Sequence, residues 1–185
     1  MGFGQVLAIE HLHNMALPEW ITTDVFEMAT RAADSAFDFF LGGPAFGELE
    51  NVELASLWGG IMLNEMIENM EKKIRNETEV LYYAYSGHDM NIAAILRIFG
   101  AKEAILGEAS AGYASTIVLE LWEVAKGSYA VRVRFSMDAK SPFVTVTDKV
   151  DGCPQLELCP LNAFIESRQK YIVKNLTERC AAKKN

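Results

Sequence analysis

The residues best suited to chemistry are His88 and Asp89, which directly follow a run of apolar and aromatic residues, Val80–Tyr85. Such a run is typical of a strand buried on both faces of a parallel sheet, and the next apolar residues predict a helix, Asn91–Phe99. Ligands of open α/β sheets bind where strand ends meet helix N-termini, which favour anions. An imidazole there can hydrogen-bond a phosphate oxygen, and a carboxylic acid can protonate a leaving oxygen. We therefore expect both side chains to open onto a concave surface.

The other candidates for chemistry are weaker, and Asp89 itself has a plain alternative, since Asp is a preferred N-cap residue. His11 and His13 are spaced like a metal-binding pair, but no third ligand is evident, which favours ordinary loop histidines. The stretch Gly42–Gly47 lacks the Lys and Ser/Thr of a phosphate loop and is interpreted as a helix stop. Ser86 lies in no Gly-x-Ser-x-Gly elbow. The sequence predicts neither a metal ion nor a cofactor.

Two cysteines, Cys153 and Cys159, lie six positions apart in one loop. Their spacing does not match a zinc knuckle and no histidine lies near them, so a short disulfide is the better interpretation. A disulfide indicates an oxidising compartment. Cys180 is then left without an evident partner.

Two Asn-x-Thr triplets begin at Asn76 and Asn175 and are acceptor sites for N-glycosylation. Such triplets also arise by chance, so an ordinary helix-end asparagine remains an alternative at both positions. The first ten residues contain no basic region and too short an apolar stretch for a signal peptide. The compartment of this form is therefore left unknown.

Composition narrows the range of partners. The 185 residues fit one globular domain, half of them are hydrophobic, and the net charge is −8. Binding to nucleic acid or to anionic membranes requires clustered cations, which the chain lacks, so we expect no nucleic-acid partner. No apolar run reaches the roughly 18 residues that a membrane-spanning helix needs.

Two helices are predicted before the His88 segment. Asp24 and Glu27 are spaced as a capping box at the start of the first helix, which Gly42 and Gly43 terminate. The second helix runs from about Asn51 to Arg75. A glycine pair in its middle, Gly59–Gly60, costs helix stability and is expected to let another backbone approach closely.

Two alternating strands, Thr116–Val124 and Tyr129–Phe135, predict a hairpin in which the apolar residues of one strand match those of the other. A last helix is predicted at about Leu161–Val173. A strand at Val80–Tyr85 that is buried on both faces needs parallel neighbours, yet the chain offers no second run of this kind. The sequence therefore lacks the parallel strands that would complete the expected sheet.

The segment Tyr85–Asp89 resembles the His-Asp motif of the histidine acid phosphatases of the prostatic and lysosomal type. The likeness continues at His13–Trp20, which is similar to the entry to the family's helical cap, and at Gly59–Glu65, which resembles its glycine-pair helix. Cys153 and Cys159, with the residues up to Phe164, resemble the family's late disulfide loop. These matches occur in the right order over nearly the whole chain.

The resemblance implies an α/β fold, of which this chain is the C-terminal part. Residues 1–78 would form a helical cap-like segment, and residues 79–185 would form part of a core with a partial parallel or mixed sheet and flanking helices. It also implies metal-free hydrolysis of small phosphomonoesters at acid pH through a phosphohistidine. Within it, His88 would hold the phosphate oxygens and Asp89 would protonate the leaving alcohol.

The departure from the family is large, because the Arg-His-Gly motif that carries the nucleophilic histidine does not occur in this sequence. We expect an incomplete member that is inactive as this chain alone, with the missing half supplying the parallel strands and the partner of Cys180. The family's cysteines at two other positions are replaced by Ile9 and Thr116. The family is secreted, lysosomal or membrane-anchored outside the cytoplasm.

Two other interpretations remain. One is a non-catalytic interaction protein that forms a homodimer or pairs with a full-length relative through a family-like dimer surface. The other is an unrelated small α/β binding domain, which would require the ordered matches to be accidental.

Overall fold

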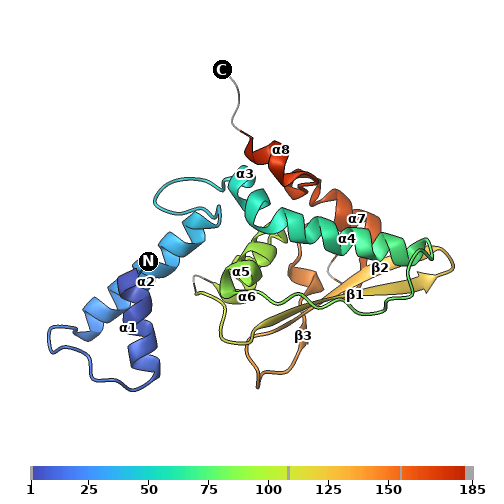
Figure 1. The fold of residues 1–185 in the computed structure, drawn as a ribbon. Coiled ribbons are helices and arrows are strands. Elements are labelled where there is room, and N and C mark those ends of the chain that lie inside the picture. The colour runs from blue at the N-terminus through green and yellow to red at the C-terminus, as the bar shows by residue number, and fades with distance from the viewer. Residues whose placement is uncertain (1, 108, 155, 182–185) are drawn as a thin grey trace.

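The structure is a computed structural model that describes residues 2–107, 109–154 and 156–181 of the chain. A helical hairpin projects from a body in which one long broken helix crosses a small twisted sheet (Figure 1). The principal elements are α1 (Gly2–Leu12), α2 (Thr23–Phe40), α3 (Val52–Ala55), α4 (Ile61–Ile74), α5 (Asp89–Ile98), α6 (Lys102–Leu106), β1 (Thr116–Ala125), β2 (Ser128–Ser136), β3 (Val144–Thr145), β4 (Cys159–Pro160), α7 (Leu161–Glu166) and α8 (Leu176–Cys180).

The hairpin consists of α1, which the sequence did not predict, and α2. A β-carbon added to Gly4 would lie 2.2 Å from the carbonyl oxygen of Ala29, so glycine lets α1 pack directly onto the α2 backbone. The N-cap of α2 is Thr22, whose Oγ1 accepts a hydrogen bond from the Val25 amide at 3.4 Å. The capping box predicted two residues later is therefore wrong, because Thr22 already supplies the acceptor.

The long helix matches its predicted bounds but is interrupted by a π-helical turn, Ser56–Gly60, between α3 and α4. Asn51 caps its start by accepting a hydrogen bond from the Leu54 amide at 3.0 Å. A β-carbon on Gly60 would lie 1.9 Å from the carbonyl oxygen of Tyr171, and one on Gly59 would lie 3.0 Å from that of Ala94. The close backbone approach predicted for this glycine pair is confirmed, and it is made by two different segments.

The predicted hairpin is confirmed. β1 and β2 pair antiparallel, and Leu119 lies opposite Val133 in the register, as the alternating pattern requires. The short strands β3 and β4 also pair antiparallel with β2. The last predicted helix is shorter than expected, because α7 ends at Glu166 and a separate 3₁₀ turn, Gln169–Tyr171, follows it.

The strand predicted at Val80–Tyr85 is not formed. The segment is irregular, and its side chains are open to solvent, with Leu81 85% and Tyr82 80% exposed. An isolated strand cannot satisfy its own backbone groups, and within the described residues no other strand pairs with this one. The chain keeps the mixed helix-and-sheet architecture expected of the α/β class, but every described strand pair is antiparallel.

One hydrophobic core joins α4, α5, the inner face of β2 and α7, and its fully buried members include Leu63, Leu96, Val133 and Phe164. A smaller cluster of Phe37, Leu41 and Ala93 packs the C-terminal part of α2 against α5. The helical hairpin is thus attached to the same helix that begins at Asp89.

Candidate functional site

A cavity of about 760 Å³ lies among α1, α2, α4, the N-terminal part of α5 and the loop that precedes β1. Both His88 and Asp89 line it, at the start of α5, although the strand expected before them is not formed. Both residues are exposed. The cavity has the size of a small-molecule site.

The geometry at the start of α5 fixes the backbone of this pair. His88 is the N-cap residue, and its backbone amide donates a hydrogen bond to Oδ1 of Asn91 at 2.9 Å. Oδ1 of Asp89 accepts a hydrogen bond from the Met90 amide at 2.9 Å. An anion bound beside these residues would face the positive end of the ten-residue helix α5.

The residue before His88 is Gly87, and the structure shows why a larger residue would not fit there. A β-carbon at Gly87 would lie 2.8 Å from Oδ1 of Asn91, which is the acceptor of the His88 amide. Any side chain at this position would push Asn91 away from its cap. The glycine therefore allows the turn that presents the imidazole.

Tyr85 connects the irregular segment Val80–Tyr85 to α4. Its hydroxyl accepts a hydrogen bond from Nδ2 of Asn69 at 2.9 Å, and its ring lines the cavity. Burial raises the pKa of the Tyr85 phenol, and the hydrogen bond from Asn69 acts in the opposite direction. Tyr85, the last residue of the Val80–Tyr85 run, is thus fixed to α4 by its hydrogen bond with Asn69.

Two further polar residues line the cavity, Asp34 on α2 and Ser110 in the loop before β1, and neither was expected from the sequence. The Ser110 hydroxyl donates a hydrogen bond to Oδ1 of Asp34 at 2.9 Å. They lie 76 positions apart, so no local pattern could have linked them. The one available indication was that Asp34 follows Thr30 and Ala33 at helical spacing, on the α2 face that lines the cavity.

Behind the cavity, α2 is joined to the end of α5 by charged groups. Nη2 of Arg97 donates hydrogen bonds to both carboxylate oxygens of Asp38. Nζ of Lys102 lies 3.5 Å from the same carboxylate and donates a hydrogen bond to the carbonyl oxygen of Gly107 at 2.7 Å. Lys102 is almost fully buried, so this carboxylate balances two largely enclosed cations.

The weaker candidates do not join this site. The His11 ring packs on Phe26 with centroids 4.9 Å apart, and within the described parts of the chain no three His, Cys, Asp or Glu residues are grouped as a metal site. The stretch Gly42–Gly47 follows the end of α2, with Gly42 at φ +85, as predicted for a helix stop. Ser86 is exposed in the irregular segment that precedes α5.

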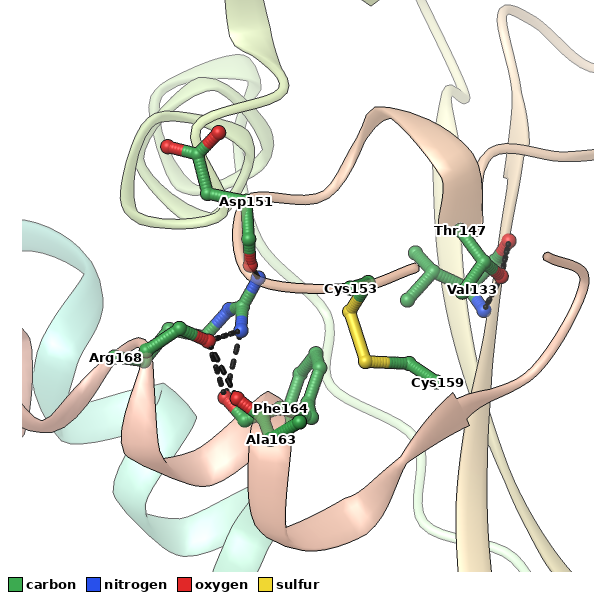
Figure 2. The surroundings of a disulfide bond; sticks show 9 residues. Val133, Thr147, Asp151, Cys153, Cys159, Ala163, Phe164 and Arg168 are labelled. Carbon is green, nitrogen blue, oxygen red and sulfur yellow. Dashed lines mark hydrogen bonds between the residues drawn. A yellow bond between two sulfur atoms is a disulfide. The ribbon is translucent and has the colours of Figure 1, made fainter. Parts of the chain in front are cut away.

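The disulfide between Cys153 and Cys159 is present, as predicted (Figure 2). Beside it, the buried guanidinium of Arg168 donates hydrogen bonds to the carbonyl oxygens of Asp151 and Phe164 at 2.9 and 2.6 Å. Burial lowers the pKa of Arg168 to about 10. Cys180 is exposed and free.

Both asparagines of the predicted glycosylation triplets are exposed at helix ends. Asn76 follows the end of α4 with a positive φ of 56. Asn175 caps α8 by accepting a hydrogen bond from the Glu178 amide at 3.1 Å. The geometry supports the structural role at each position and leaves modification a prediction.

Among the described residues, none of the helices combines the length and the apolar composition that a bilayer-crossing segment requires.

Comparison with known proteins identifies relatives. Residues 13–136 match the sequence profile of the histidine phosphatase superfamily (branch 2). The chain is 30% identical over 179 residues to lysosomal acid phosphatase of Xenopus laevis, covering 94% of this chain and 38% of that protein. It is 27% identical to the human lysosomal acid phosphatase, with the same coverage, and 24% identical to mouse prostatic acid phosphatase, covering 42% of it. The chain therefore spans about two fifths of the length of these relatives.

Proposed function

Because the chain belongs to branch 2 of the histidine phosphatase superfamily, we propose that it forms the C-terminal part of an acid phosphatase that hydrolyses phosphate monoesters. The observation that carries the proposal is the placement of His88 and Asp89 together on the cavity wall at the start of α5. The family profile covers these two residues. The cavity walls provide the leaving-group side of such a site.

In the proposed reaction, His88 holds the oxygens of the phosphate at the positive end of α5. A histidine from an Arg-His-Gly segment, which this sequence does not contain, attacks phosphorus and forms the phosphohistidine. As the ester P–O bond breaks, Asp89 gives its proton to the departing alkoxide, so that a neutral alcohol leaves. Water then cleaves the N–P bond and releases phosphate.

We further propose that residues 1–78 act as the cap and residues 79–185 as part of the catalytic core. The hydrophobic contacts of α2 with α5 support a cap that stays attached to the site. An oxidising compartment outside the cytoplasm is supported by the Cys153–Cys159 disulfide and by relatives named lysosomal and prostatic acid phosphatases.

The test measures hydrolysis of a phosphate ester by a fusion protein. The N-terminal part of the Xenopus laevis lysosomal acid phosphatase, up to the point where the likeness begins, is joined to this chain and assayed at acid pH with p-nitrophenyl phosphate. We expect the fusion to turn over and the isolated chain to match a control without protein. His88→Ala in the fusion should weaken hydrolysis. Turnover by the isolated chain that persists in its His88→Ala variant would contradict the proposed mechanism.

A second candidate is a non-catalytic protein that pairs with a full-length relative or with itself. The exposed run with Leu81 and Tyr82 favours it, because such side chains are usually covered by a partner. Light scattering of the isolated chain, alone and mixed with the relative, separates the two candidates. Stable pairing together with an inactive fusion would favour this one.

A further inference from the structure

The cavity beside His88 and Asp89 contains a carboxylate that the proposed reaction does not use. Asp34 points its side chain from α2 to the Ser110 hydroxyl, and both residues line the cavity. Asp34 is half-buried, and no Lys or Arg among the described residues forms an ion pair with it. A single neutral hydrogen bond therefore balances a partly desolvated negative charge.

The ionisable side chains of the cavity wall are mostly acidic. Asp34 and Asp89 are its two carboxylates, and His88 is its one residue able to become a cation among the described lining residues. The proposed reaction assigns His88 to the phosphate. A second anionic group on the leaving alcohol would therefore meet like charge, whereas a cationic group would meet Asp34.

The remaining wall suits an organic cation better than a hydrated one. Much of it is aliphatic and thioether surface from α1, α4, α5 and β1, namely Ile9, Leu12, Met62, Met66, Ile92 and Ile117. Tyr113, in the same loop as Ser110, also lines the cavity and is 71% exposed. The face of an aromatic ring is a favourable place for an alkylammonium group.

We infer that the leaving-group side of this cavity selects phosphomonoesters of amino alcohols, with Asp34 pairing with the ammonium group and Ser110 holding the Asp34 carboxylate. The inference rests on the proposed phosphatase function and names its substrate class. Asp34 is a specificity-determining residue in this arrangement, because it touches the part of the substrate that does not react. Asp89 remains the group that protonates the leaving oxygen.

The test compares two ligands that differ in one atom. Phosphocholine carries a quaternary nitrogen, and neohexyl phosphate has the same shape with carbon in its place. Each is titrated into the isotope-labelled chain while NMR follows the amides of Asp34, Ser110 and Tyr113, and separately that of His88. We expect phosphocholine to bind about five-fold more tightly than neohexyl phosphate, the size of a modest ion pair.

Asp34→Asn should remove this preference while keeping the fold, because the amide oxygen of Asn can still accept the Ser110 hydrogen bond. Asp24→Asn is the matched control, since Asp24 lies on the same helix but does not line this cavity. It should keep the preference. Equal affinity for the two ligands, no binding of either, or loss of the preference in both variants would overturn the inference.

The same titration separates this inference from the proposed function. Shifts at His88 with both phosphates support the phosphate site, whatever the preference between the ligands. A preference for phosphocholine that depends on Asp34, with His88 unaffected by both ligands, would support the cation site and count against the proposed phosphatase role.

Discussion

The guanidinium carbon of Arg168 lies 4.2 Å from the centre of the Phe164 ring, and the Phe99 ring covers it at 5.1 Å. The side chain is only 1% exposed and donates to carbonyl oxygens of both the disulfide loop and α7 (Figure 2). One cation thus connects the end of α5, the loop that holds Cys153 and the helix that follows Cys159. The aromatic faces and the carbonyl oxygens replace part of the hydration that burial removes.

Arg168→Met should destabilise the chain by about 3 kcal/mol, because it removes the hydrogen bonds that Arg168 donates to the carbonyl oxygens of Asp151 and Phe164, and Phe164 is fully buried. The measurement is urea denaturation followed by circular dichroism. Arg75→Met is the control, since Arg75 makes its ion pairs at the surface, where solvent screens them, and should contribute little to stability. Equal losses in the two variants would show that the enclosed cation has no special role.

The glycine pair gives a second prediction. Gly60→Ala should cost about 3 kcal/mol or more, since the new methyl group would overlap the carbonyl oxygen of Tyr171. Gly2→Ala, in α1, meets no atom within 4 Å and should change stability by less than about 0.5 kcal/mol. Thermal unfolding of both variants checks the difference. Similar midpoints would mean that the backbone of Tyr171 moves away at little cost.

The sequence predicted this approach because a glycine pair inside an amphipathic helix is unfavourable unless something else needs the space. It also predicted the hairpin register, since alternation along β1 and β2 is set locally by side-chain burial. The prediction of a strand at Val80–Tyr85 was wrong because strand formation does not depend on the local pattern alone. Its pattern encodes burial on both faces, but a strand forms only when a neighbour supplies hydrogen bonds, and the described chain supplies none.

The residues of the candidate site could be proposed from the sequence only where they are adjacent in the chain. His88 and Asp89 are adjacent and directly precede a helix pattern, so one segment shows both the residues and the element that positions them. Asp34 on α2 meets Ser110 in the loop before β1 only in the folded chain, through tertiary packing that no short stretch of sequence contains. The residue proposed to select the substrate is therefore harder to find in the sequence than the pair proposed to cleave it.

The Asp38 carboxylate gives a third prediction. Asp38→Asn leaves Arg97 and Lys102 enclosed without their counter-charge and should destabilise the chain by about 3 kcal/mol. Adding Lys102→Met should recover part of this loss, because one of the two uncompensated charges is then gone. Glu53→Gln breaks only an exposed pair with Arg179 and serves as the control. If the double variant were less stable than Asp38→Asn alone, the charge argument would fail.

The cysteines give a fourth prediction. A thiol reagent should label one cysteine in the native, unreduced chain, and peptide mapping should place the label at Cys180. Replacing Cys153 and Cys159 by serine together should cost about 2 kcal/mol by the loop-closure estimate for so short a loop. Mapping that found Cys180 bonded to either loop cysteine would contradict the pairing.

The final prediction concerns Asp89, which can be either a general acid or only a helix-start residue. In the fusion with the relative's N-terminal part, Asp89→Asn should slow hydrolysis of alkyl phosphates by about 100-fold, because an alkoxide needs a proton to leave. The loss should be much smaller for p-nitrophenyl phosphate, whose leaving group is stable as an anion. Steady-state kinetics on the two substrates measure the difference.

Asn91→Ala is the matched control, because it removes the acceptor of the His88 amide at the same helix start without touching the carboxyl group. It disturbs the position of the pair, so it should slow both substrates by a similar factor. A general acid and a helix-start residue therefore differ in the ratio of the two losses, and the absolute size of the losses does not separate them. If Asp89→Asn slowed both substrates equally, as Asn91→Ala is expected to, the carboxyl group of Asp89 would be serving the helix and not the leaving alcohol.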